Sequence, residues 1–149
     1  MEPVTKERLA RYISLKKENE NRLERLARMR SNAELPALQQ GDCSKGSGSS
    51  MDRMARAVEK CMEYEAQIRP LIEANRREMA VIEDAVAALK DPLEREVLRL
   101  RYMDGEYCQL MTWSQVCILL YGSDEEKYLR STYRIHGLAL QNIRRAELR

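Results

Sequence analysis

The chain lacks phenylalanine and has one tryptophan and one histidine among its 149 residues. β-Branched residues are sparse, and no run alternates apolar and polar side chains as a half-buried strand does. Glu, Arg, Leu, Ala, Lys and Met, which favour helices, dominate instead. Apolar residues make up 44% of the chain, which is enough for helices with one buried face but little for a large core. The composition therefore predicts an all-α protein.

Further absences exclude several kinds of site. No apolar run approaches the roughly 20 residues that span a bilayer, and no apolar segment follows residues 1–6 as in a signal peptide. The four cysteines, which form no Cys-x-x-Cys pair, are Cys43, Cys61, Cys108 and Cys117. With His136 as the only histidine, a zinc site is not expected. No catalytic triad order or phosphate-binding glycine loop is present either. We therefore expect a cytoplasmic protein without membrane contact, metal, cofactor or enzymatic activity.

The first 90 residues predict a region of long, coiled-coil-like helices. Residues 5–35 form the first expected helix, with Thr5 as its N-cap. Residues 36–50, rich in glycine and serine towards their end, predict a flexible linker. Residues 51–90 repeat apolar side chains at the 3-4 spacing of a coiled-coil seam. Pro70 lies inside this pattern and predicts a kink or break near Ala66, because proline removes one helical hydrogen bond.

The seam of residues 51–90 needs a helical partner, because an exposed apolar stripe of that length promotes aggregation. Two partners remain open at this point. Residues 5–35 can fold back across the linker to form a hairpin, or the same segment of a second chain can form a homo-oligomer. The residues expected at this interface are Met54, Val58, Ile68, Ile72, Met79, Ile82, Val86 and Leu89.

Residues 91–149 predict three shorter helices. Asp91 and Pro92 suit the start of the first, and Glu94 can complete a capping box there. The second begins with the capping-box pattern of residues 112–115 and ends at Gly122. Its expected apolar face is Val116, Leu119 and Leu120. The third runs from about residue 127 to 145, and its expected buried residues are Thr132, Ile135, Ala139, Leu140 and Ile143. A short capped helix, a turn and a longer basic helix are typical of a helix-turn-helix.

Charge is unevenly distributed over this region. Residues 127–149 hold six basic residues and one acidic residue, a formal charge of +5. Residues 91–126 hold three basic and eight acidic residues, a formal charge of −5. A basic end beside an acidic block indicates one face suited to an anion, with a solvated helix face as the alternative.

Two segments carry a family resemblance. Residues 93–102, LEREVLRLRY, are similar to the first helix of sigma-factor region 4. Residues 133–140, YRIHGLAL, resemble the recognition helix of phage-encoded relatives of that fold, the RinA-like and ArpU-like late transcriptional regulators. The resemblance covers residues 91–149 and implies a DNA-binding domain there, with residues 1–90 as a separate helical region. The connection at residues 106–111 is longer than in that family, and the turn at residues 122–127 is expanded and acidic.

The resemblance implies a phage or prophage regulator that binds double-stranded promoter DNA, with RNA polymerase as a further partner. Arg130 and Arg134 are expected to contact base edges, because arginine can bond guanine with two hydrogen bonds. The residues expected to position the helix on phosphates are Lys127, Tyr128, Ser131 and Tyr133.

The alternative is a structural or interaction protein of phage assembly in which the coiled coil is the main function. A small-terminase-like protein, which joins DNA recognition to oligomerisation, lies between the two hypotheses. A basic face that holds Arg130 and Arg134 together favours DNA, whereas neutralisation by Glu125 and Glu126 favours an interaction protein.

Overall fold

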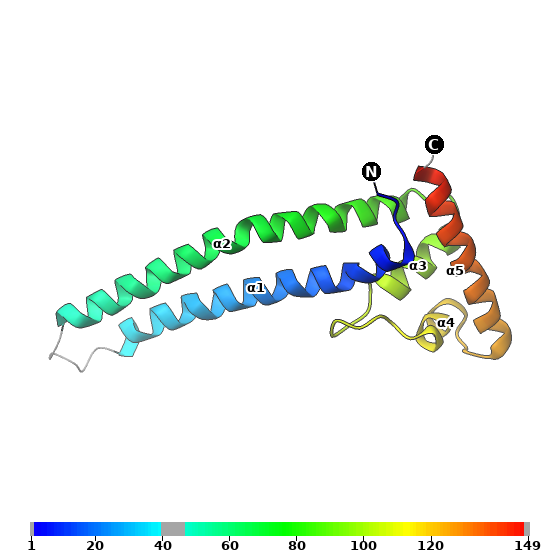
Figure 1. The fold of residues 1–149 in the computed structure, drawn as a ribbon. Helices are drawn as coiled ribbons and strands as arrows, with labels where there is room; N and C mark the ends of the chain where they lie inside the picture. Colours follow the sequence, from blue (N-terminus) through cyan, green and yellow to red (C-terminus); the bar gives the residue numbers. More distant parts are fainter. Residues whose placement is uncertain (1, 40–46, 148–149) are drawn as a thin grey trace. The chain divides into compact units, whose positions relative to one another are not determined.

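The computed structural model describes residues 2–39 and 47–147, which form five α-helices and no strand (Figure 1). The helices are α1 (Lys6–Gln39), α2 (Ser47–Ala87), α3 (Pro92–Tyr102), α4 (Trp113–Tyr121) and α5 (Glu126–Glu147). The expected all-α class is confirmed. Across the described ranges, no helix combines the length and apolar character needed to cross a membrane.

The chain divides into two compact units. Unit 1 comprises Met1–Lys17 and Arg76–Arg149, and unit 2 comprises Glu18–Asn75, so α1 and α2 contribute to both. We expected a boundary after residue 90. The observed division differs because the start of α1 and the end of α2 share a core with residues 91–149. The buried residues of that core are Val4, Leu9, Tyr12, Ile82, Val86, Leu89, Leu98, Tyr102, Met103, Ala139 and Ile143.

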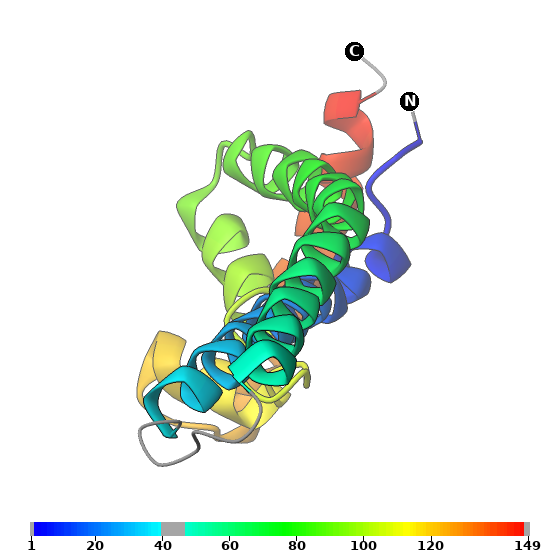
Figure 2. The same ribbon diagram turned by 90° about the vertical axis from the view of Figure 1, so that its left-hand side faces the viewer.

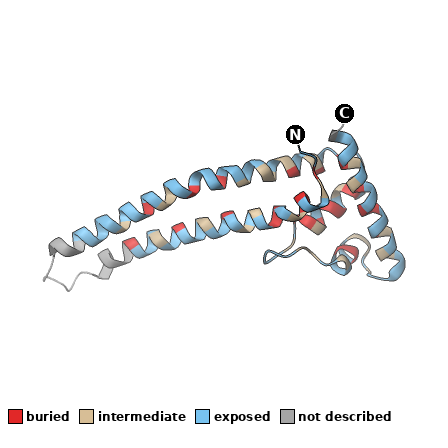
Figure 3. Cartoon of the chain, in the orientation of Figure 1, coloured by how far each residue is buried: buried red, intermediate tan, exposed pale blue. Residues whose placement is uncertain are grey.

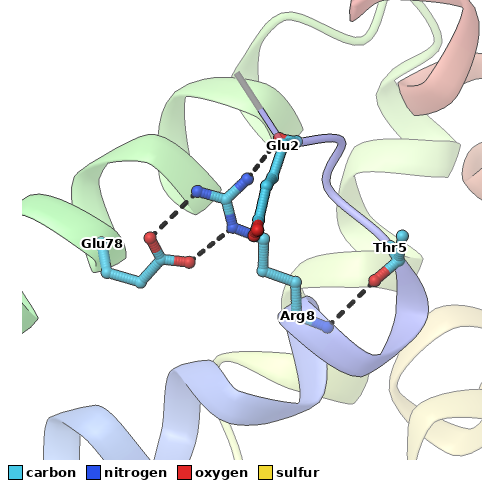
Figure 4. A network of polar contacts seen from close by, with 4 residues as sticks. All are labelled: Glu2, Thr5, Arg8 and Glu78. Carbon is cyan, nitrogen blue, oxygen red and sulfur yellow. Dashed lines mark hydrogen bonds and ion pairs between the residues drawn. The ribbon is translucent and has the colours of Figure 1, made fainter.

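In unit 1 a partly buried ion pair joins the start of α1 to α2 (Figure 4). The Arg8 guanidinium donates to both carboxylate oxygens of Glu78, at 2.5 and 2.9 Å, and to the Glu2 carbonyl at 2.6 Å. Arg8 is 8% exposed. The pKa of the Glu78 carboxyl is lowered, mainly because Arg8 donates to it. As expected, Thr5 caps α1, since its hydroxyl accepts from the Arg8 backbone N–H at 3.3 Å.

In unit 2 α1 and α2 lie side by side and antiparallel (Figures 1 and 2). Leu26 of α1 packs against Ile68 and Ile72 of α2. The polar seam position Asn75 is also satisfied, because its amide donates to Glu18 at 3.0 Å and to the Asn19 side chain at 3.1 Å. Folding back of α1 therefore covers this part of the seam within one chain, and a polar contact at a seam position can fix the register of the pair.

The expected interface residues differ in how far they are buried, and Figure 3 colours the chain by burial. Five are buried, namely Ile68, Ile72, Ile82, Val86 and Leu89, and Met79 is half-buried. Met54 and Val58 are 41% and 43% exposed. The seam is thus covered towards the end of α2 and open near its beginning.

The two long helices extend further than expected, both at the linker and through Pro70. α1 continues to Gln39 and α2 begins at Ser47, so the expected linker of residues 36–50 is helical at both of its ends, and residues 40–46 lie outside the described residues. α2 also runs through Pro70 without a break. Of the expected kink or break near Ala66, the break was wrong, because burial of Ile68 and Ile72 holds the helix on both sides of the one missing hydrogen bond.

Local signals at the ends of α3 and α4 behave largely as expected. The Asp91 carboxylate accepts from the Leu93 N–H at 2.8 Å, and the Thr112 hydroxyl accepts from the Gln115 N–H at 3.3 Å. Glu94 does not complete the expected capping box. Its buried carboxylate instead accepts from the Asn142 amide of α5, at 2.9 and 3.0 Å, and so ties α3 to α5.

α4 buries only part of the expected face, because Val116 is buried and Leu120 half-buried while Leu119 is exposed. Val116 and Cys117 are fully buried, whereas Leu119 is 58% exposed and Ile118 is 46% exposed. Residues 116–121 are all apolar, so the positions of α3 and α5 decide which of them are covered.

Candidate nucleic-acid interface

A four-residue turn, residues 122–125, joins α4 to α5. Gly122 adopts the left-handed conformation, with φ of +79°, and its N–H donates to the Ile118 carbonyl at 2.7 Å. Glycine is favoured at this position because it has no Cβ to clash. The turn is shorter than the expected residues 122–127, since α5 already begins at Glu126. A turn of three or four residues containing glycine is typical of a helix-turn-helix.

α5 presents opposite faces to the core and to solvent. The buried face consists of Thr132, Ile135, His136, Ala139 and Ile143. Residues on the other side recur every three or four positions and are exposed, and we call them the outer stripe. They are Lys127, Arg130, Arg134, Gly137, Gln141 and Arg145. Four of the six are cations and none is acidic, so this side of α5 attracts anions.

Aromatic contacts hold the buried face of α5 against α3 and α4. The Tyr102 hydroxyl and His136 Nε2 are hydrogen-bonded at 2.6 Å. The half-buried Trp113 ring meets His136 edge-on, with centroids 4.7 Å apart, and the Arg101 guanidinium lies 4.5 Å from the Trp113 ring centre. Burial lowers the pKa of His136 to about 4, with smaller contributions from Lys6 and Arg101. His136 is therefore neutral at pH 7 and positions α5.

Glu125 of the turn and Glu126 at the start of α5 pair with the first cations of the outer stripe. The Arg130 guanidinium lies 2.7 Å from Glu126, and Lys127 Nζ lies 3.8 Å from Glu125. All four side chains are between 66% and 78% exposed, so water screens both pairs and each contributes little to stability. Arg134 makes no ion pair within the described part of the chain. The first two cations of the outer stripe are thus paired with carboxylates, whereas the stripe from Arg134 onwards is basic and unpaired within the described residues.

The structure separates the six expected DNA contacts into two groups. Lys127, Arg130 and Arg134 lie on the outer stripe. Tyr128 and Ser131 are half-buried beside it, and Tyr133 turns its exposed ring edge-on to Trp113, with centroids 5.1 Å apart. Three members of the stripe were not among the expected contacts, namely Gly137, Gln141 and Arg145. The 3-4 spacing that continues from Arg134 was the signal that could have found them.

Comparisons with known proteins add no relative. No protein-family model, curated protein or solved structure matches this chain. What supports a function is therefore the geometry of α4 and α5 and the charge on the outer stripe.

Proposed function

We propose that this protein is a transcriptional regulator that binds double-stranded DNA by placing the outer stripe of α5 in the major groove. One observation carries the proposal: a four-residue turn precedes a long helix whose outer stripe holds four cations and no carboxylate. Helix-turn-helix proteins place the second helix in the major groove in this way. Arginine and lysine then contact phosphates, and arginine can also read guanine.

The ion pairs of the acidic turn are compatible with this role. Glu125 and Glu126 hold Lys127 and Arg130 only through solvent-exposed pairs. Such pairs contribute about 0–1 kcal/mol, so a phosphate can replace either carboxylate at small cost. Tyr128, Ser131 and Tyr133 flank the stripe, where a hydroxyl can donate to the sugar-phosphate backbone.

The resemblance of residues 91–149 to sigma-factor region 4 extends the proposal to promoters of a phage or prophage. It also suggests RNA polymerase as a second partner. The hairpin of α1 and α2 then serves as a helical arm, and the open beginning of its seam, with Met54 and Val58, offers a contact for a second copy.

The proposal is tested by DNA binding at several salt concentrations. We expect affinity for a random duplex to fall steeply as salt rises, because bound cations release counterions from DNA. Replacing Lys127 or Arg145 with alanine should lower the slope of log K against log salt by about one each. The matched control is Arg53→Ala, which removes an exposed cation from α2 and should leave the slope unchanged.

Two outcomes would contradict the proposal. The first is a wild-type Kd weaker than about 10⁻⁴ M at physiological salt, both with and without RNA polymerase. The second is equal loss of binding in Arg53→Ala and Arg134→Ala.

A second candidate function is that of an interaction protein of phage assembly. The observation that favours it is the exposed apolar pair Ile118 and Leu119 on α4, next to the acidic turn. Exposed apolar side chains grouped in this way mark protein contacts when a partner covers them. Leu119→Asp should then abolish partner or self-association while leaving DNA affinity unchanged, as measured by sedimentation with and without DNA.

A further inference from the structure

Gly137 lies in the middle of α5 without a role inside the described fold. Its backbone is helical, so it does not need the left-handed freedom that Gly122 uses. A Cβ added at Gly137 would meet no neighbouring side chain or other packed atom within 4 Å, so no close contact excludes a larger residue. A glycine inside a helix nevertheless weakens it relative to alanine. The fold alone therefore gives no physical reason for glycine at this position.

The exposed side chains around Gly137 are longer than its own hydrogen atom. Arg134 precedes it by about one turn, Gln141 follows by about one turn, and Leu138 beside it is 46% exposed. Gly137 thus forms a notch at which the helix backbone is accessible. A missing side chain on an exposed face allows a ligand to approach the backbone closely.

The dimensions of the outer stripe agree with a ligand centred on this notch. Lys127 to Arg145 spans roughly 27 Å along the helix, whereas the major groove is only about 12 Å wide. The segment between Arg134 and Gln141 spans roughly 10 Å and so matches the groove floor. Arg130, already paired with Glu126, lies outside this segment towards the groove edge.

We propose that Gly137 marks the closest approach of DNA to α5, and that the bases are read by Arg134, Leu138 and Gln141 around it. This inference rests on the proposed DNA-binding function. The chemistry of these side chains identifies the bases: arginine pairs with guanine, glutamine with adenine, and an apolar side chain contacts the thymine methyl group. About three consecutive base pairs lie within 10 Å, since base pairs are stacked 3.4 Å apart. Arg130 binds phosphate and has no part in sequence choice.

A substitution series at Gly137 distinguishes effects on thermal stability from effects on DNA affinity. Gly137→Ala should raise the midpoint of thermal unfolding by about 2–4 °C, because alanine favours the helix and meets no obstacle. The same variant should weaken binding to the preferred duplex about tenfold, the loss expected when one base contact is broken. Ser and Leu complete the series. Stability should follow helix propensity, with Ala above Leu above Ser, while binding should weaken in the order of side-chain size.

Selection from a random duplex library then tests which residues read bases. Arg134→Ala and Gln141→Ala should each lose preference at one base pair. The matched control, Arg130→Ala, should bind all duplexes more weakly and keep the wild-type preference.

The outcomes distinguish this inference from the proposed function. Wild type that binds no DNA refutes both. Wild type that binds DNA while Gly137→Ala binds equally well, or is less stable than wild type, overturns the inference and leaves the function standing. A series that alters self-association instead of DNA affinity would show that the notch receives a second helix.

Discussion

The Tyr102 hydroxyl of α3 lies 2.6 Å from Nε2 of His136 on α5. Both residues are buried, and Trp113 of α4 covers the imidazole edge-on. The chain's only histidine therefore sits where all three helices of the candidate DNA-binding region meet, and its protonation state bears on all of them.

Acid should destabilise unit 1 through His136. Its pKa falls to about 4 in the folded state because burial disfavours the charged ring, whereas the unfolded value is about 6.5. The unfolded chain thus binds more protons between these values, so stability is complete above about pH 6.5 and is lost as pH falls towards 4. We expect a loss of about 2 kcal/mol from this group between pH 7.5 and pH 5, measured by urea unfolding. His136→Gln should remove most of the pH dependence in that window, and an unchanged dependence would contradict the assignment.

Breaking the Arg8–Glu78 pair should weaken unit 1. Glu78→Gln removes the negative charge that faces a buried guanidinium, and we expect a loss of about 1–3 kcal/mol, reduced because Glu78 is one-third exposed. The control is Glu65→Gln, which breaks the exposed pairs with Arg30 and Arg69 and should cost less than about 1 kcal/mol. Chemical unfolding at pH 7 compares the two, and equal losses would contradict the role of burial.

A charge placed on α2 should destabilise the fold more strongly where the replaced residue is more buried. Ile82→Glu puts a carboxylate at a fully buried position, and we expect a loss of about 4 kcal/mol or more with reduced helicity. Met62→Glu, at a position 64% exposed, should change stability by less than about 0.5 kcal/mol. Circular dichroism reports the first effect. Sedimentation adds a second readout, because a lower mass for folded Met62→Glu would reveal an interface between chains.

Alanine at Gly105 should be harmful, in contrast to alanine at Gly137. A Cβ there would lie 2.0 Å from the Gln109 carbonyl oxygen and 2.8 Å from Cδ1 of Ile13. The carbonyl belongs to the backbone of the long connection before α4, which cannot shift without moving that connection. We expect a loss of about 1–3 kcal/mol from overpacking, measured by thermal unfolding. A neutral Gly105→Ala would show that the connection is held more loosely.

The features that sequence reasoning found are those set by neighbouring residues. Thr112 and Asp91 cap their helices because a cap depends on a span of only a few residues. The buried side of α4 was misjudged at Leu119, because the apolar run of residues 116–121 offers several faces and only packing chooses among them. The packing of Leu9 with the last helix was not predicted, since no local pattern links positions more than a hundred residues apart.

The candidate site shows the same limit. Periodicity places Arg130 and Arg134 on one exposed face. It does not show that Glu126 holds Arg130, which depends on side-chain conformations in the folded turn. Attention to charge alone also passed over Gly137 and Gln141, which carry no charge but lie on the same stripe.

The core of unit 1 combines Leu9 and Tyr12 with Ile143. During synthesis from the N-terminus, Leu9 and Tyr12 are made well before Ile143, so they cannot pack against it until it has been synthesised. At the usual rate of translation that interval is roughly 7–27 s, far longer than helix formation takes. The hairpin of unit 2 has all its residues available much sooner. We therefore expect unit 2 to form while the ribosome is still at work and unit 1 to close only after α5 has been released.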